Sequence, residues 1–171
     1  VNGSRGYIQD LIDNASDEDT ILVLSGIYNE HIIIDKKINL IGENKNNTII
    51  DGNFKDSVIS ITPNADYVKI SNFTIKNCGD SGMYSDINSC IYIRSDFVEI
   101  YNNIIMSNFK YYDWYWSCGI LVENSNYAII KNNNINGKPI VILEDETDIL
   151  FDSEVGQLIL FKCENITVEN L

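Results

Sequence analysis

The stretches VKISNFTI (68–75), VEIYNNII (98–105) and AIIKNNNI (128–135) decide the fold, because they repeat one pattern at an interval of 30 residues. A related stretch, ITVENL, begins at Ile166 after a longer interval. Apolar and polar residues alternate within each stretch, as in a β-strand with one buried face. Alignment of the stretches gives two apolar columns and a column of Asn, which consists of Asn72, Asn102, Asn132 and Asn170.

Each repeat also contains an earlier short strand, so that a unit reads strand, turn, strand, Asn turn and strand, followed by a variable loop. The earlier strands are VISI (58–61), CIYI (90–93), GILV (119–122) and QLIL (157–160). One step upstream, INLIG (38–42) lies 30 residues before VKISN (68–72), with Gly42 in place of the Asn. A single unit cannot bury its apolar face, whereas stacked units can.

Stacking of equivalent parallel strands, about 4.8 Å apart, aligns identical residues in columns. The Ile and Val columns then form a continuous interior, and the Asn column forms a hydrogen-bonded ladder that satisfies the turns. This arrangement is a parallel β-helix. The alternative is an antiparallel β-sandwich with chance repeats, and four Asn residues in register argue against it.

The two ends of the chain fit a single β-helix domain over residues 1–171. YIQDLIDNAS carries Ile8, Leu11, Ile12 and Ala15 on one helical face, which predicts a helix at about residues 4–15 that covers the N-terminal end of the stack. The coils are expected over about residues 20–171. Because the last unit stops after TVENL, we expect a fragment of a longer β-helix whose open C-terminal edge can pair with another copy.

The stretch DTILVLSGIYNEHIIIDKKINLIGENKNNTIIDGN (19–53) resembles the opening coils of right-handed parallel β-helix proteins of the pectin-lyase-like superfamily. The likeness is greatest to the NosD-like, carbohydrate-binding and sugar-hydrolase type of repeat, and GKPIVILEDETDILFDSEVGQLILFKCENITVENL (137–171) resembles a later segment. The resemblance implies an all-β, right-handed, single-stranded parallel β-helix in a secreted or cell-surface protein. It is specific for fold only, because the superfamily includes lyases, hydrolases, binding modules and stalks.

Composition excludes several classes of function. The chain has 25 acidic and 12 basic side chains and a net charge of −13, which repels a nucleic-acid backbone and an anionic membrane surface. No run of about 18 apolar residues is present, so we expect no membrane insertion.

Two loops exceed what a bare coil needs, namely CGDSGMYSDINSC (78–90) and MSNFKYYDWYWSC (106–118). They leave successive units at equivalent points, so we expect them to be neighbours. The aromatic run of the second loop lies outside the repeat, and its rings either cover apolar surface or present flat faces to sugar rings. The predicted glycan-binding residues are Tyr84, Tyr111, Tyr112, Asp113, Trp114, Tyr115 and Trp116.

Catalysis by these loops is an open alternative. Glycoside hydrolysis usually needs two carboxyl groups about 5–9.5 Å apart, and Asp86 and Asp113 are the candidates, although loop carboxylates are commonly just solvated. The resemblance also includes lyases, which need a basic residue beside a Ca²⁺-binding carboxylate cluster. Arg94 has only Asp96 close to it in sequence, which departs from that pattern.

The sequence contains no recognisable cofactor motif. Hard oxygen donors for Ca²⁺ occur together at Glu144, Asp145, Glu146 and Asp148, without the Gly-punctuated spacing of a dedicated calcium loop. The single His31 offers no copper site.

The four cysteines do not have the spacing of a zinc site. Cys78 and Cys90 bracket the first loop, which makes a loop-closing disulfide one of the three full pairings open to them with Cys118 and Cys163.

The sequence therefore favours a secreted or cell-surface module that binds a polysaccharide or glycan through its aromatic loops without catalysis. The first alternative is a structural stalk, adhesion or self-association segment. The second is a polysaccharide hydrolase or lyase.

Overall fold

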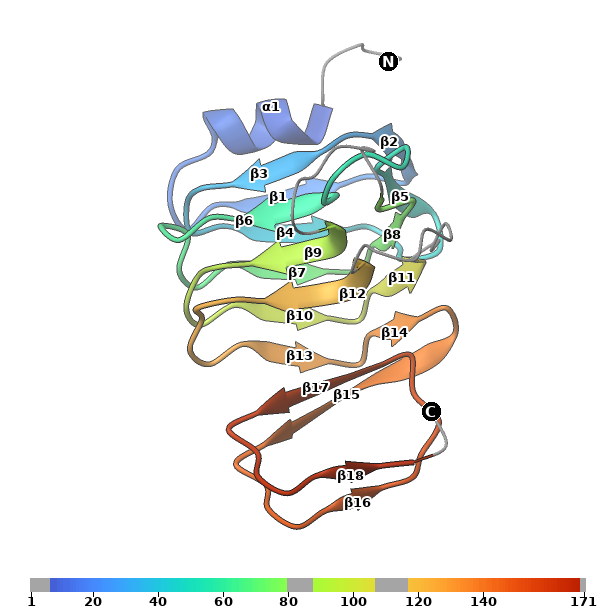
Figure 1. The fold of residues 1–171 in the computed structure, drawn as a ribbon. Coiled ribbons are helices and arrows are strands. Elements are labelled where there is room, and N and C mark those ends of the chain that lie inside the picture. Colours follow the sequence, from blue (N-terminus) through green and yellow to red (C-terminus); the bar gives the residue numbers. More distant parts are fainter. Residues whose placement is uncertain (1–6, 80–87, 107–116, 170–171) are drawn as a thin grey trace.

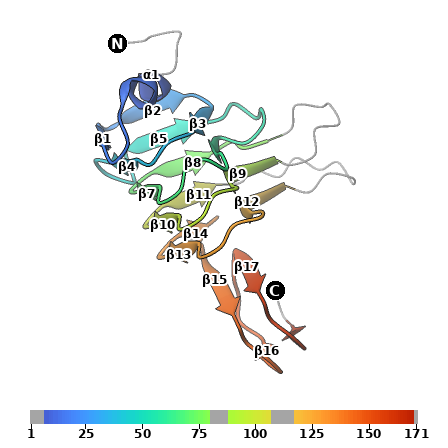
Figure 2. The same ribbon diagram turned by 90° about the vertical axis from the view of Figure 1, so that its left-hand side faces the viewer.

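The chain winds through three parallel sheets in turn, so that each coil contributes one strand to each sheet (Figures 1 and 2). The computed structural model describes residues 7–79, 88–106 and 117–169, with the backbone alone for Asn88, Ser117 and Cys118. The predicted right-handed parallel β-helix, with a helix at its N-terminal end, is confirmed.

The three sheets are named here by their position in Figure 1. The front sheet consists of β3 (Ile32–Ile34), β6 (Ile59–Ile61), β9 (Asn88–Ile93) and β12 (Ser117–Val122). The back sheet consists of β1 (Thr20–Val23), β4 (Asn39–Gly42), β7 (Lys69–Ser71), β10 (Glu99–Tyr101) and β13 (Ile129–Lys131). The side sheet begins with β2 (Gly26–Asn29), β5 (Thr48–Asp51), β8 (Thr74–Lys76), β11 (Ile104–Met106) and β14 (Asn134–Ile135).

The 30-residue repeat sets the register of the stack. In the back sheet Leu40, Ile70, Ile100 and Ile130 pair in succession. The first three are fully buried, and Ile130 in the last coil is 7% exposed. A side chain of this size contributes about 1.5–3 kcal/mol when it is fully buried, so the Ile columns stabilise the interior as predicted.

The predicted Asn column lies at the turns between the back and side sheets. Asn72, Asn102 and Asn132 all have positive φ, between 56° and 64°, a conformation that Asn tolerates better than other side chains with a Cβ. Asn102 Nδ2 donates to Asn72 Oδ1 at 2.6 Å, as a ladder requires, whereas Asn132 is exposed. The fourth member, Asn170, lies outside the described residues.

A second Asn column, one position further along the chain, satisfies the buried turn groups. Asn103 is fully buried and Asn133 is 5% exposed. Asn103 Oδ1 accepts the Phe73 N–H at 3.0 Å, and Asn133 Oδ1 accepts the Asn103 N–H at 2.9 Å. Each Nδ2 also donates to a carbonyl oxygen of the coil above, on Ile70 or Ile100. The repeat predicted a ladder but assigned the inward role to the neighbouring Asn.

Helix α1 (Tyr7–Asn14) closes the N-terminal end of the stack (Figure 1). Ile8 and Ile12 are fully buried against the first coil. The buried carboxylate of Glu30 accepts the N–H groups of Ile8 and Gln9, an interaction favoured at a helix N-terminus. The Gln9 amide accepts the Ile33 N–H at 2.8 Å and donates to the Ile33 carbonyl at 3.1 Å. It therefore pairs with the otherwise open edge of β3, as another strand would.

The C-terminal segment leaves the register of the coils at a β-hairpin. Asn136 and Gly137 both have positive φ, 51° and 84°, as a two-residue type I′ turn requires. This turn reverses the chain, so β15 (Lys138–Glu144) runs antiparallel to β14. β17 (Gln157–Phe161) then pairs in parallel with β15, and β18 (Thr167–Val168) pairs with β16 (Leu150–Phe151).

This hairpin corrects two predicted alignments. QLIL (157–160) was expected to stack below GILV (119–122), but its strand pairs with β15. Val168 was expected below Ile130, but it pairs with Phe151 and is 37% exposed.

Candidate functional site

The two long connections leave and rejoin the stack on neighbouring coils. At their start Lys76 pairs with Met106, and at their end Asn88 pairs with Ser117. The strand ends that flank the two connections are therefore adjacent, as the repeat predicts. A disulfide between Cys78 and Cys90, one of the possibilities that the sequence left open, is present and joins the two ends of the first connection. Cys163 is a free thiol.

The connections themselves, residues 80–87 and 107–116, lie outside the described residues. They contain all the residues predicted to bind sugar or to catalyse its hydrolysis. These residues are Tyr84, Asp86, Tyr111, Tyr112, Asp113, Trp114, Tyr115 and Trp116. Their roles stay predictions.

A polar cluster lies on the outer face of the front sheet that both connections enter. Tyr92 projects outward from β9, and its hydroxyl donates to Glu123, which follows β12 in the next coil. The Arg94 guanidinium lies over the Tyr92 ring, with Cζ 4.9 Å from the ring centroid. Burial raises the pKa of Tyr92, and the hydrogen bond to Glu123 adds to the rise, so the phenol stays protonated at neutral pH and cannot act as a base.

Arg94 retains unused hydrogen-bonding capacity. Its Nε is buried without a hydrogen-bond partner among the described residues, as is the hydroxyl of Thr62. Thr62 is the adjacent residue in the coil above, because Ile61 pairs with Ile93. A buried donor without a partner is costly, and the planar guanidinium is the type of group that binds hydroxyl or carboxylate groups of a ligand.

An exposed aromatic column runs along the corner between the front and back sheets. Tyr67, Phe97 and Tyr127 occupy equivalent turn positions with positive φ, and adjacent rings are parallel within 6°, with centroids 4.7 and 5.4 Å apart. Lys37 Nζ lies 5.3 Å from the Tyr67 centroid and covers the first ring. Because stacked rings cover each other's faces, the far face of Tyr127 is the end of the stack with neither a ring nor a cation against it among the described residues.

Sequence reasoning missed this column, although the signal was present. ADYV, SDFV and SNYA place an aromatic residue directly before each of the aligned repeats.

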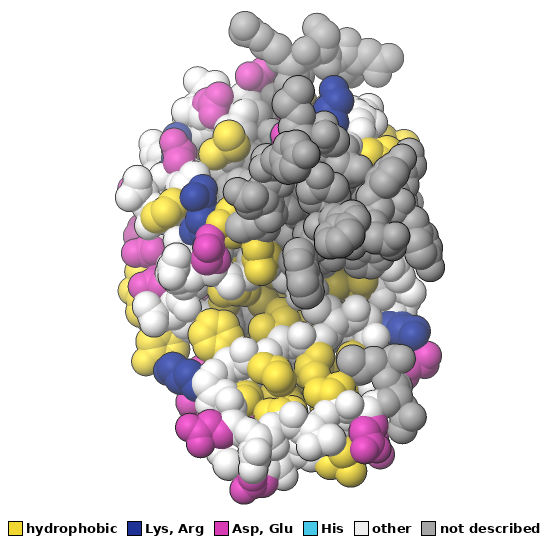
Figure 3. Space-filling model, in the orientation of Figure 1, with side chains coloured by type: hydrophobic (Ala, Val, Ile, Leu, Met, Phe, Trp, Pro, Cys, Tyr) yellow, Lys and Arg dark blue, Asp and Glu magenta, His cyan; other side chains and the backbone are white. Residues whose placement is uncertain are grey.

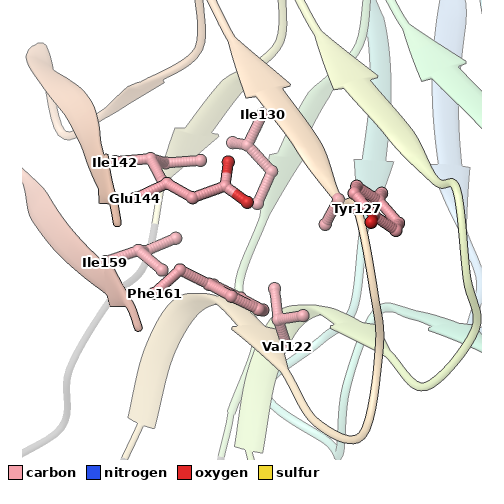
Figure 4. A pocket seen from close by; sticks show the side chains of 8 residues that line it. Val122, Tyr127, Ile130, Ile142, Glu144, Ile159 and Phe161 are labelled. Atoms are coloured by element: carbon pink, nitrogen blue, oxygen red, sulfur yellow. The ribbon is translucent and has the colours of Figure 1, made fainter. Parts of the chain in front are cut away.

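A hollow lies between the last coil and the C-terminal strands (Figures 3 and 4). About 280 Å³ of free space, part of which is open solvent, lies between its walls. Ile142, Glu144 and Phe161 project from β15 and β17 toward Ile130 of the last coil, and Tyr127 lies on the opposite side. Hydrophobic side chains gather on this part of the molecular face.

The structure does not bring the side chains of the acidic segment, residues 144–148, together as metal ligands. Among the described residues no three His, Cys, Asp or Glu side chains converge on a common point. Asp148 Oδ1 accepts the Asn165 amide at 2.8 Å, and Glu144 lines the hollow. His31 Nδ1 lies 3.0 Å from the Ser57 carbonyl oxygen, and Asp145 and Glu146 are exposed. The Ca²⁺ role of this segment stays a prediction.

Solved structures that resemble this fold include several of pectin methylesterases. One, in complex with hexasaccharide VII, has a TM-score of 0.46 and 16% sequence identity over 93% of this chain and 63% of that chain. A mutant in complex with hexasaccharide IV has a TM-score of 0.41 and 19% identity over 83% and 53% of the two chains. Pectin methylesterase PemA from Erwinia chrysanthemi has a TM-score of 0.44 and 13% identity over 94% and 64%.

This chain therefore spans less than two thirds of the length of each of these enzymes. Likeness at this level transfers neither a site nor an activity, and the fold itself rests on the strand pairing described above. No protein-family profile and no curated protein matches the sequence, so the narrower resemblance to NosD-like repeats stays a prediction. No helix among the described residues is long and apolar enough to cross a membrane.

Proposed function

We propose that this β-helix is a secreted or cell-surface module that binds a polysaccharide or glycan on its front sheet without cleaving it. The observation that carries the proposal is the cluster of Tyr92, Arg94 and Glu123 on the sheet that both long connections enter. The guanidinium and the carboxylate supply hydrogen bonds to hydroxyl groups. The aromatic residues of the connections, Tyr84, Tyr111, Tyr112, Trp114, Tyr115 and Trp116, would supply flat faces for sugar rings.

The disulfide supports the location. The bond between Cys78 and Cys90 fits an oxidising compartment such as the cell exterior, since cytosolic thiols are normally kept reduced.

The electrostatics of the cluster support binding rather than hydrolysis. Of the described residues in this cluster, Glu123 is the one carboxylate, and it accepts a hydrogen bond from a protonated Tyr92. Hydrolysis usually needs a second carboxyl group on the other side of the scissile bond. If Asp86 and Asp113 were catalytic, wild-type protein would release reducing ends or unsaturated products, and Asp113→Asn would abolish that release.

Affinity electrophoresis in gels that contain individual polysaccharides tests the proposal. We expect at least one polysaccharide to retard wild-type protein, and both Arg94→Ala and the double variant Trp114→Ala/Trp116→Ala to lower the affinity about tenfold or more, the effect of losing about 1.4 kcal/mol. Tyr101→Leu, a substitution in the same coil on the back sheet, is the matched control and should bind as wild type. Equal retardation of wild type and both binding variants, or no retardation in any gel, would contradict glycan binding.

One observation favours self-association as a second candidate. β17 is the last strand of its sheet, and Leu160 on it is 45% exposed. An unpaired edge of this kind can pair with another chain. Light scattering would then show an oligomer at micromolar concentration that Leu160→Lys converts to a monomer.

A further inference from the structure

The hollow below the last coil combines two aromatic rings, apolar walls and one carboxylate. Tyr127 and Phe161 supply the rings, and Ile130 and Ile142 are among the apolar residues. Figure 4 shows the Glu144 carboxylate directed from β15 toward Ile130, into the space between the strands.

Glu144 is an exposed, unpaired charge at the edge of an otherwise apolar lining. Its carboxylate makes no hydrogen bond or ion pair with the described residues, and neither Lys nor Arg lines the hollow. The ion pair formed by a neighbouring strand residue, Lys138 with Glu154, lies outside this lining. A neutral ligand that covered the hollow would displace water from the Glu144 carboxylate without supplying a compensating positive charge, which is unfavourable.

Tyr127 contributes an available ring face. Phe97 covers one side of the Tyr127 ring at 5.4 Å, and 64% of the Tyr127 surface is exposed. At the opposite end of the same column Lys37 covers the Tyr67 ring, so a cation already occupies the first face of the stack. The last face offers the same type of interaction to a cation from outside.

We infer that this hollow binds a small organic cation with an apolar body, such as a methylated ammonium group. Glu144 would neutralise the charge, the rings of Tyr127 and Phe161 would attract the cation through their faces, and the Ile side chains would bury its methyl groups. The net charge of −13 favours the approach of a cation. A sugar ring fits less well, because Glu144 and the Tyr127 hydroxyl are the only polar side-chain groups in the lining. The inference is independent of glycan binding, because neither Tyr127, Glu144 nor Phe161 belongs to the front-sheet cluster.

Choline and 3,3-dimethylbutan-1-ol form a matched pair of probes, because they share shape and hydroxyl group and differ in the charge on the central atom. Titration of isotopically labelled protein, followed by NMR, should show choline-dependent shifts of the Tyr127, Glu144 and Phe161 amides. We expect choline to bind about tenfold or more tightly than the neutral alcohol. Equal affinities, or no shifts at these residues at tens of millimolar choline, would overturn the inference.

Two variants and a control locate the site. Glu144→Gln keeps the shape of the side chain and should weaken choline about tenfold while leaving the neutral alcohol unaffected. Phe161→Leu keeps an apolar wall but removes the ring, and should weaken choline severalfold. Glu146→Gln removes an exposed charge nearby that does not line the hollow, and should bind choline as wild type. Loss of binding in Glu146→Gln equal to that in Glu144→Gln would show non-specific attraction to an acidic surface and contradict the site.

Discussion

A glutamine side chain caps the front sheet at each end of the stack, but the N-terminal end is closed more completely than the C-terminal end. At the N-terminal end the Gln9 amide pairs with both backbone groups of Ile33 on β3. At the C-terminal end the Gln157 amide pairs with both backbone groups of Ile120 on β12, at 3.0 and 2.6 Å. The first glutamine belongs to a helix that plugs the core, whereas the second belongs to β17, which leaves a hollow beside the last coil.

The difference shows what a stacked coil contributes. Between these ends each coil has a neighbour on both sides, and its inward-facing Ile residues, such as Ile50, Ile70 and Ile100, are fully buried. Beyond the hairpin each strand has one parallel partner, and no residue of β15 or β17 is fully buried. Parallel pairing alone therefore does not create a dry interior. Closure by all three sheets does, and the open end is where a ligand can enter.

Removal of an interior side chain should have the largest effect on this contrast. Ile70→Ala should lower the free energy of unfolding by about 4 kcal/mol, because it creates a cavity between buried coils. Ile159→Ala in β17 should lower it by about 1 kcal/mol, since that side chain is only partly buried. Urea denaturation measures both. Similar losses would mean that the C-terminal strands pack as tightly as the coils.

Substitutions at two glycines test the same contrast between the closely stacked coils and the C-terminal hairpin. A Cβ at Gly42 would lie 2.2 Å from the Asn72 carbonyl oxygen of the next coil, so Gly42→Ala should cost about 3 kcal/mol. A Cβ at Gly137 would meet nothing within 4 Å, and Gly137→Ala should cost only the strain of its positive φ, about 1 kcal/mol. The midpoints of urea unfolding would rank the two variants. The reverse order would contradict the close approach of coils at Gly42.

The two end-capping glutamines should be equivalent and independent. Gln9→Ala and Gln157→Ala should each cost about 1 kcal/mol, because each exposes two backbone groups at a sheet edge. The double variant should show the sum, since the sites lie at opposite ends of the front sheet. Hydrogen exchange of the Ile33 and Ile120 amides provides the measurement, with exposed Asn47→Ala as the control. Unchanged protection of Ile120 in Gln157→Ala would refute the cap at that end.

The smallest effect concerns pH. Burial alone would raise the pKa of Asp51, but hydrogen bonds from the Asn53 N–H, Asn77 and Lys76 outweigh it and hold the pKa below its usual value. Because the folded pKa is depressed, this contribution to stability is fully present above about pH 4 and is lost as the pH falls through the folded pKa. Wild-type protein should therefore lose stability more steeply below pH 4 than Asp51→Asn. An exposed control, Asp35→Asn, should follow the wild type in acid urea titrations, and parallel curves for Asp51→Asn would rule out this role.

The sequence predicted the stack well because its repeat is long, regular and rich in β-branched residues. The 30-residue spacing of Ile70 and Ile100 is found as direct strand pairing. The helix at Tyr7–Asn14 follows from the apolar spacing of Ile8 and Ile12. The repeat does not show which Asn faces inward. Asn102 and Asn103 are adjacent and both recur 30 residues later, and a shift of one position in the in–out alternation exchanges their orientations.

The C-terminal register was wrong for a physical reason that the sequence contains. Asn136–Gly137 between apolar segments is a strong signal for a two-residue hairpin. The longer interval before ITVENL was compatible with a continued repeat, which places β17 and β18 in the coils. The hollow and its carboxylate are a consequence of that turn and could not be found while the repeat was assumed to continue.

The most direct test of the stacked coils is a methyl–methyl NOE spectrum of protein labelled at the Ile δ1 positions. The structure predicts cross-peaks between Ile70 and Ile100 and between Ile100 and Ile130, because these residues occupy adjacent coils. It predicts none between Ile70 and Ile130, which are two coils, or about 9.6 Å, apart at the spacing of β-strands. Missing cross-peaks between the adjacent pairs, or a direct one between Ile70 and Ile130, would contradict the stacking on which both proposed sites depend.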